Sequence, residues 1–190
     1  MPISAVSLCN RALDMIGADP ITSLADAIKP ARLCERNYEA VRDAVLRAYP
    51  WNSAMRRAAL PALSEAPAWG FARQFELPND CLRLYHIDGE IDIGSRYRIE
   101  GRRVLTDETA PLKILYIARI EDPTIFDPLL GDAIAARLAA DLAFALTGSA
   151  ALGQSLIHAY RDKLSEARRT DAQEGSADGL TASDWLESRL

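Results

Sequence analysis

The chain has 190 residues, enough for one ordinary domain or for a helical body with a small second lobe. Hydrophobic residues make up 49% and charged residues 26% of the chain, a composition typical of globular proteins that excludes intrinsic disorder. The net charge is −5, and residues 122–190 carry the acidic excess, which argues against the clustered Lys and Arg that DNA binding needs.

Residues 1–66 are predicted to form the first part of a helical body, because apolar side chains recur there every three or four positions. The helices expected in this part cover residues 4–16, 30–48 and, after a break at 49–52, 53–59. Ser4 is placed to cap the first helix and Gly17 to end it, while Pro30 occupies the first turn of the second.

Residues 67–121 change to the alternating pattern of β-strands and are predicted to form an inserted, mostly antiparallel β-rich lobe. The strands expected here cover residues 71–77, 81–87, 91–93, 97–99, 102–105 and 112–120. A tight hairpin turn is expected at residues 100–101. The run 112–120 is apolar on both faces apart from Lys113 and Arg119, so we expect it to be the central strand.

Residues 122–174 are predicted to complete the helical body. An alanine-rich helix is expected to start at Pro128, and a last helix to follow Ser149 as its cap. Residues 175–190 combine glycines with small polar residues and lack a helical period, so they are predicted to form a flexible C-terminal arm. The fold class is therefore α+β and mainly α: a helical bundle with an inserted small antiparallel β-rich lobe and a flexible tail.

The three cysteines, Cys9, Cys34 and Cys81, show no CxxC or Cys/His spacing and are interpreted as core residues in a reducing compartment. The N-terminal sequence lacks the basic and apolar regions of a signal peptide. No apolar run reaches the roughly 18–20 residues of a membrane span. We therefore expect a cytoplasmic site of synthesis and no membrane contact.

Few groups in the sequence are arranged for catalysis. His86 and His158 lie outside any metal-binding motif, and no phosphate-binding glycine loop is present. The alternating carboxylates Asp88, Glu90 and Asp92 could hold a cation, but a charged edge strand that discourages sheet pairing is the favoured interpretation. We expect no enzymatic activity, no cofactor and no metal site.

Two features are candidate contacts with other subunits. One is a cluster of arginines at the predicted hairpin: Arg96, Arg98, Arg102 and Arg103. One interpretation is that these arginines contact a phosphate or a partner. The other is that they form an exposed hairpin face whose positive charge nearby carboxylates balance. The other is the apolar pair Trp185 and Leu186 in the arm, which we interpret as an anchor because tryptophan is enriched at binding hot spots.

Short packing and turn motifs follow one another through residues 3–170. In chain order they are LCNRAL (8–13), IG (16–17) and PITSL (20–24); ARLC (31–34), Tyr38, VRD (41–43) and YPWNSA (49–54); FELPNDCLR (75–83); YRIEGR (97–102) and LTD (105–107); YIAR (116–119) and FDPL (126–129); and AARLAA (135–140) through LTGS (146–149). In this order and spacing they resemble the tail tubular protein A family of short-tailed bacteriophages.

This resemblance implies a structural virion protein, a head–tail adaptor whose subunits form a dodecameric ring directly below the portal. The ring joins the portal to a tail nozzle similar to tail tubular protein B, and DNA passes through its lumen during genome ejection without specific binding. The resemblance also implies a helical bundle with an inserted β-rich lobe, a location in the tail or neck of the virion after synthesis in the host bacterial cytoplasm, and no catalysis.

Three other interpretations remain open at this stage. The first is a head–tail connector, or neck adaptor, of a long-tailed phage or a phage-derived particle, with the same fold and different partners. The second is a metal-dependent enzyme that uses the carboxylates near residue 90, and the third is a small cytoplasmic regulator. If the chain is an adaptor, we expect a largely monomeric subunit that forms rings on the portal, with an arm that becomes ordered against a neighbour or the portal.

Overall fold

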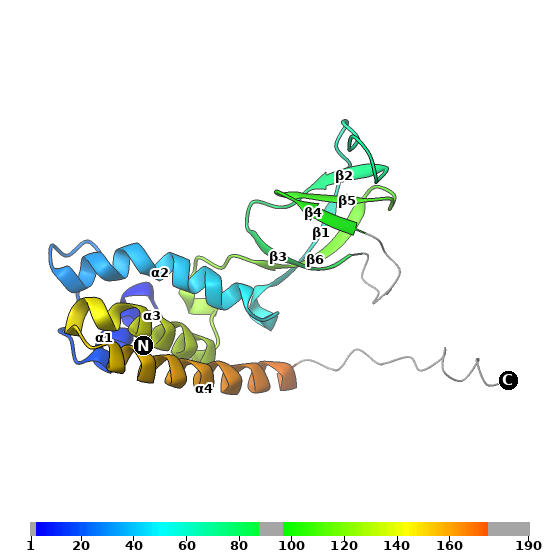
Figure 1. Cartoon of the computed structure of the whole chain (residues 1–190). Coiled ribbons are helices and arrows are strands. Elements are labelled where there is room, and N and C mark those ends of the chain that lie inside the picture. Colours follow the sequence, from blue (N-terminus) through cyan, green and yellow to red (C-terminus); the bar gives the residue numbers. More distant parts are fainter. Residues whose placement is uncertain (1–2, 88–96, 175–190) are drawn as a thin grey trace.

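The structure is a computed structural model that describes residues 3–87 and 97–174. The protein is elongated, with a helical body at one end and a β-rich lobe at the other (Figure 1). The fold class is α+β and mainly α, which confirms the prediction from the sequence. None of the described helices is long and apolar enough to cross a membrane.

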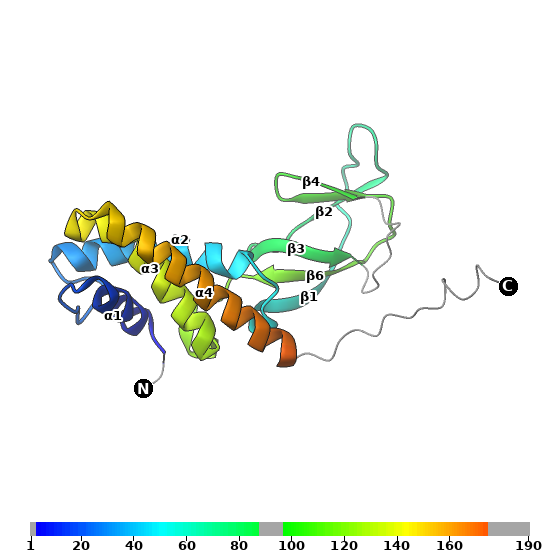
Figure 2. The ribbon, with the colours of Figure 1, turned by 60° about the horizontal axis from the view of Figure 1, so that its bottom comes forward.

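The helical body combines helices from two separate stretches of the chain. In chain order they are α1 (Ala5–Ile16), α2 (Lys29–Arg47), α3 (Pro128–Thr147) and α4 (Ala150–Glu174). The alanine-rich α3 is the central helix, since it packs against the other three, and α4 lies along it (Figure 2). Gly131 of α3 faces α1, where the Leu8 side chain would lie 3.4 Å from an added Cβ, which is an ordinary contact distance.

The ends of the helices follow the predicted capping residues. The Ser4 side chain accepts a hydrogen bond from the Ser7 backbone N–H, and the Ser7 hydroxyl accepts one from the Ser4 backbone N–H, which completes a capping box. Gly17 ends α1 with a φ of 74°, in the left-handed region that glycine adopts readily. The Ser149 hydroxyl accepts from the Leu152 backbone N–H at the start of α4.

The lobe consists of two three-stranded antiparallel sheets. The strands are β1 (Met55–Leu60), β2 (Arg73–Glu76), β3 (Cys81–Ile87), β4 (Tyr97–Glu100), β5 (Arg103–Thr106) and β6 (Leu112–Ala118). One sheet has the order β1-β6-β3 and the other β2-β5-β4. β6 is therefore the central strand of its sheet, as its apolar sequence predicted. Two short 3₁₀ helices, Asn52–Ala54 and Pro123–Ile125, lie where the chain passes between body and lobe.

The prediction of a helix over residues 53–59 is wrong. The chain makes one 3₁₀ turn and then β1, which pairs with β6 from Met55 opposite Ile117 to Leu60 opposite Leu112. The residues of β1 have no strong preference for a strand, and it is the ladder with β6 that satisfies their backbone groups. The β-rich part thus begins inside the range 1–66 that was assigned to helices.

The hairpin between β4 and β5 is also shifted by one residue from its prediction. Glu100 pairs with Arg103, so Gly101 and Arg102 form the two-residue turn, and Gly101 has a φ of 60°. The strand predicted at residues 91–93 and the arm at 175–190 lie outside the described residues.

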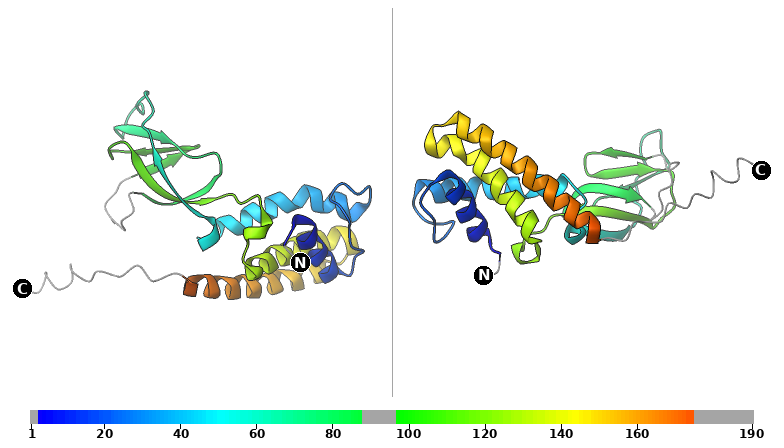
Figure 3. Two further views of the ribbon diagram at one scale, coloured as in Figure 1. Left: turned by 180° about the vertical axis from the view of Figure 1, so that it is seen from behind. Right: turned by 90° about the horizontal axis from the view of Figure 1, so that it is seen from below.

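The lobe stands at the end of the body where α2 and α4 both end (Figure 3). Ile117 of β6 is buried in the core of the helical body, so the two parts share apolar contacts. The backbone N–H of Asn52 donates to the Asp171 carboxylate at 3.1 Å, and the Asn52 side chain donates to the Asp171 carbonyl at 2.7 Å. These bonds connect the last turns of α4 to the segment that leads into β1.

An ion-pair chain provides a second connection between body and lobe. The Asp43 carboxylate of α2 contacts the Arg42 guanidinium at 2.9 Å and the Arg119 guanidinium, just beyond β6, at 2.7 Å. Arg42 is only 4% exposed and lies over the Tyr38 ring. Its charge is accommodated because Asp43 lies beside it.

Candidate interaction surface on the β-rich lobe

The outer face of the sheet β2-β5-β4 carries a hollow of about 530 Å³. On this face Gln74, Leu105 and Arg98 lie side by side across the three strands, because they are register partners. The loop that precedes β2 forms the other wall. The lining residues are Glu65, Ala66, Pro67, Ala68, Trp69, Gly70, Phe71, Gln74, Glu76, Arg98, Glu100, Gly101, Arg102, Arg103 and Leu105.

The structure brings together three of the four arginines predicted as contact residues. Arg98, Arg102 and Arg103 all line the hollow, whereas Arg96 lies outside the described residues. The Arg102 guanidinium donates to the Pro78 carbonyl, and the Arg103 guanidinium donates to the Gln74 side-chain oxygen at 3.2 Å. Two of these arginines therefore also hold the hairpin against neighbouring segments.

The hollow is not a basic patch, because three glutamates share its lining with the three arginines. These are Glu65, Glu76 and Glu100. A surface that grips a phosphate backbone needs an excess of cations, which this face lacks. Alternating charges of both signs beside apolar side chains instead resemble the rim of a protein–protein interface.

Trp69 is the most exposed of the large hydrophobic side chains in the described part of the chain, at 82%. The ends of its loop are held by hydrogen bonds: Gln74 Nε2 donates to the Glu65 carbonyl at 2.8 Å, and the Ala72 N–H donates to the Asp107 carboxylate at 2.8 Å. The loop thus presents an indole ring to solvent from an anchored base, and tryptophan is enriched at binding hot spots, so Trp69 is a candidate contact residue.

Trp69 was not among the residues predicted from the sequence as contacts. The signal that could have identified it is its position between Pro67 and Gly70, since a large aromatic side chain between turn residues has little chance of being covered by its own loop.

The edge strand β4 adds further exposed apolar area to the same lobe. All four of its residues are exposed, including Tyr97 and Ile99. Within the described ranges no strand pairs with the outer edge of β4. Its alternating arginine and glutamate, Arg98 and Glu100, are the kind of charged side chains that discourage uncontrolled pairing at such an edge.

The described residues do not assemble a metal site: no group of three or more His, Cys, Asp or Glu side chains in 3–87 and 97–174 is placed to hold an ion. The carboxylates Asp88, Glu90 and Asp92 lie outside those ranges. His86 is partly buried on β3 and His158 is exposed on α4, so the structure keeps the two histidines on different parts of the protein.

The cysteines are buried, as predicted. The hydrogen-bonding contact between the Cys9 and Cys34 side chains, together with burial, raises the pKa of the Cys9 thiol. Burial also raises the pKa of the Cys81 thiol, although nearby Arg102 opposes it. Neither Cys9 nor Cys81 is thereby activated as a thiolate nucleophile.

The predicted anchor residues Trp185 and Leu186 lie outside the described residues. Among known proteins, no family model matches the chain, and no curated protein matches its sequence.

Proposed function

We propose that this protein is a structural subunit of a bacteriophage tail, a head–tail adaptor that forms a ring between the portal and the tail nozzle. The observation that supports this most is the lobe tip, which we define as the hollow of mixed charge together with the loop 65–71, where the exposed Trp69 is part of the lining. The lobe that carries it lies at one end of an elongated fold (Figure 1). Such a tip suits contact with another protein better than it suits the enclosure of a small substrate.

The architecture supports the same proposal. The resemblance to tail tubular protein A implies a helical bundle interrupted by a β-rich lobe, and this chain has that order of elements. In the proposed ring, the helical bodies of successive copies form the wall and the lobes reach towards a partner. A ring of identical subunits needs a heterologous contact, in which one face of a subunit meets a different face of the next.

The acidic balance of the chain is compatible with a channel through which DNA passes without being held. A net charge of −5 repels the phosphate backbone on average, so DNA in the lumen would not be retained by counterion release. The proposed partners are accordingly other copies of the chain, the portal and the nozzle, with no membrane and no cofactor.

The experiment that tests the proposal mixes the purified full chain with the portal protein of the same phage and images the product by negative-stain electron microscopy. We expect largely monomeric protein alone and closed rings on the portal. A subunit that forms no ring with the portal and recruits no nozzle would overturn the adaptor proposal. If the neighbouring genes encode a tape measure and a tail tube instead of a nozzle, the long-tailed connector is the correct variant.

The lobe tip is tested separately by Trp69→Ala. The residue is exposed in the subunit, so we expect an unchanged melting temperature together with a weakened attachment of portal or nozzle. Tyr85→Ala is the matched control, because Tyr85 is an exposed aromatic residue on β3 of the same lobe and does not line the hollow. Equal attachment by the parent and by the Trp69 variant would show that the lobe tip is not the contact.

A further inference from the structure

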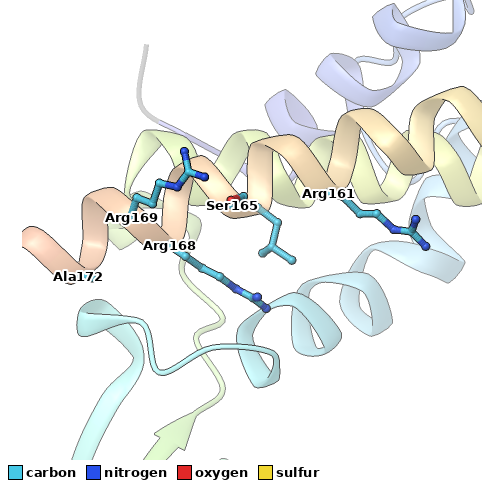
Figure 4. A pocket seen from close by; sticks show the side chains of 6 residues that line it. Arg161, Ser165, Arg168, Arg169 and Ala172 are labelled. Carbon is cyan, nitrogen blue, oxygen red and sulfur yellow. The ribbon is translucent and has the colours of Figure 1, made fainter.

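A second hollow lies along the C-terminal half of α4. Its volume is about 420 Å³, and its lining residues recur every three or four positions, so they form one face of the helix (Figure 4). They are Arg161, Leu164, Ser165, Arg168, Arg169 and Ala172. The lining contains three arginines, two apolar side chains and no carboxylate, unlike the balanced hollow on the lobe.

None of these three guanidinium groups forms an ion pair with any residue that the structure describes. Arg168 is oriented by the body: it donates to the Ala48 carbonyl at 3.2 Å and lies over the Tyr49 ring at 5.5 Å. Arg161 and Arg168 extend from α4 towards α2, whereas Arg169, at the opposite edge of this face, points away from α2 (Figure 4). The face therefore offers cations along its length, beside an apolar strip of Leu164 and Ala172.

The acidic arm of the same chain has the complementary pattern. Residues 175–190 contain three carboxylates and one arginine. Two of the carboxylates, Asp184 and Glu187, flank the pair Trp185 and Leu186. In an extended chain the Cα atoms of these two residues lie roughly 10 Å apart. Arg161 and Arg168 are separated by two helical turns, also roughly 10 Å along the axis.

We propose that the segment 184–187 of the arm docks in the α4 hollow of its own chain. A chain that folds back along α4 brings Asp184 to Arg168 and Arg169, Trp185 to the apolar strip, and Glu187 to Arg161. This inference does not depend on the phage assignment.

The arm is long enough for this return. Arg161 lies 13 residues before the end of α4, roughly 20 Å along the helix. The 11 residues from Glu174 to Trp185 span up to roughly 36 Å when extended. Gly175 and Gly179 permit the reversal of direction. Because a short tether gives an effective concentration of roughly millimolar, the chain's own arm occupies the hollow ahead of a second copy at micromolar concentration.

Docking has a consequence for assembly. In the proposed state Trp185 is covered in the isolated subunit, and the arm is held on α4 until a partner displaces it. The free subunit then exposes less apolar surface to other copies, in keeping with a monomer that assembles on a template.

The test uses the full-length chain carrying Trp69→Phe, which leaves Trp51 and Trp185 as its tryptophans. Trp51 is buried, so a change in tryptophan quenching reports on Trp185. Acrylamide quenching then reports the exposure of Trp185. We expect weak quenching that increases at about 0.5 M NaCl, where the screening length falls to roughly 4 Å. Arg161→Glu should lower the ratio of docked to free arm by roughly two- to fivefold, the effect of losing one exposed ion pair.

Exchanging the charges of Arg161 and Glu187 tests whether these two side chains contact each other. Glu187→Arg should have the same effect as Arg161→Glu, and the double variant should restore protection of Trp185. Arg57→Glu is the matched control, because it makes the same charge change on an exposed residue of β1 and should leave quenching unchanged.

Three outcomes would overturn the proposal. One is full quenching of Trp185 in the parent, with no response to Arg161→Glu. Another is protection that rises with protein concentration alongside a dimer in sedimentation, which would place the arm on a second copy. The last is Arg161-dependent binding of a short DNA duplex while Trp185 stays exposed, which would make the hollow a phosphate site.

Discussion

Trp51 is buried and Trp69 is exposed. Replacing each of them by phenylalanine should therefore show that Trp51 stabilises the fold and that Trp69 does not. Trp51 is 1% exposed, lies in the segment between α2 and β1, and donates its indole N–H to the Val45 carbonyl at 3.1 Å. Its ring meets that of Tyr49 edge-on at a centroid distance of 4.9 Å. Trp69 is 82% exposed on the lobe.

The cost of Trp51→Phe has two parts. Loss of the indole hydrogen bond costs about 0.5–1.5 kcal/mol, and the Val45 carbonyl is not left unpaired, because the Ala48 N–H also donates to it. The smaller ring leaves a cavity in a core where full truncation of a tryptophan costs about 3–5 kcal/mol. We therefore expect Trp51→Phe to lower the free energy of unfolding by about 2–3 kcal/mol, and Trp69→Phe to change it by less than about 0.5 kcal/mol.

Thermal unfolding followed by circular dichroism measures both variants. For a protein of this size, about 2–3 kcal/mol corresponds to a fall in melting temperature of roughly 4–12 °C. Urea titration gives the free energies directly. Equal melting temperatures for Trp51→Phe and the parent would refute the reasoning, because they would mean that the indole at the junction of body and lobe is not tightly packed.

Other expected outcomes concern charge and capping. Asp43→Asn should lower the free energy of unfolding in urea by about 2–4 kcal/mol, since it leaves Arg42 buried without its counterion, whereas Arg119→Ala should cost only about 0–1 kcal/mol. Burial raises the pKa of Asp171 against an opposing backbone hydrogen bond, so the folded chain holds that proton more tightly than the unfolded one. The resulting stability is present below the unfolded pKa of about 4 and is lost as the pH rises through the folded pKa. Denaturation at several pH values should therefore show Asp171→Asn losing less stability than the parent between acidic and neutral pH. Ser4→Ala removes the capping box of α1 and should cost about 1 kcal/mol in the same urea assay.

The helices were predictable because their signals are local. Ser4 and Gly17 act on backbone groups within a few residues of themselves, and an apolar stripe reflects the helical period wherever the helix packs. For the same reason the apolar run of β6 indicated a strand covered on both faces. These features define the α+β class and the order of helical and β-rich parts.

β1 was missed because its stabilising partner is distant in the chain. Its sequence MRRAAL favours a helix at least as much as a strand, and it is the hydrogen-bonded ladder with β6 that makes this segment a strand. The burial of Arg42 has a similar origin. An arginine on a helix is expected to face solvent, and its buried position depends on Asp43 and on the ring of Tyr38.

The candidate interaction surface also has one part that the sequence predicted and another that depends on the tertiary structure. The sequence alone determined that arginines gather at the β4–β5 hairpin, because that hairpin is a local structure. Only the tertiary structure placed Trp69 beside them and balanced their charge with Glu65 and Glu76, since these residues reach the hollow from β2 and from the loop before it. Periodicity and capping act over a few residues, whereas the pairing of strands and the exposure of a side chain depend on segments that meet only when the chain has folded.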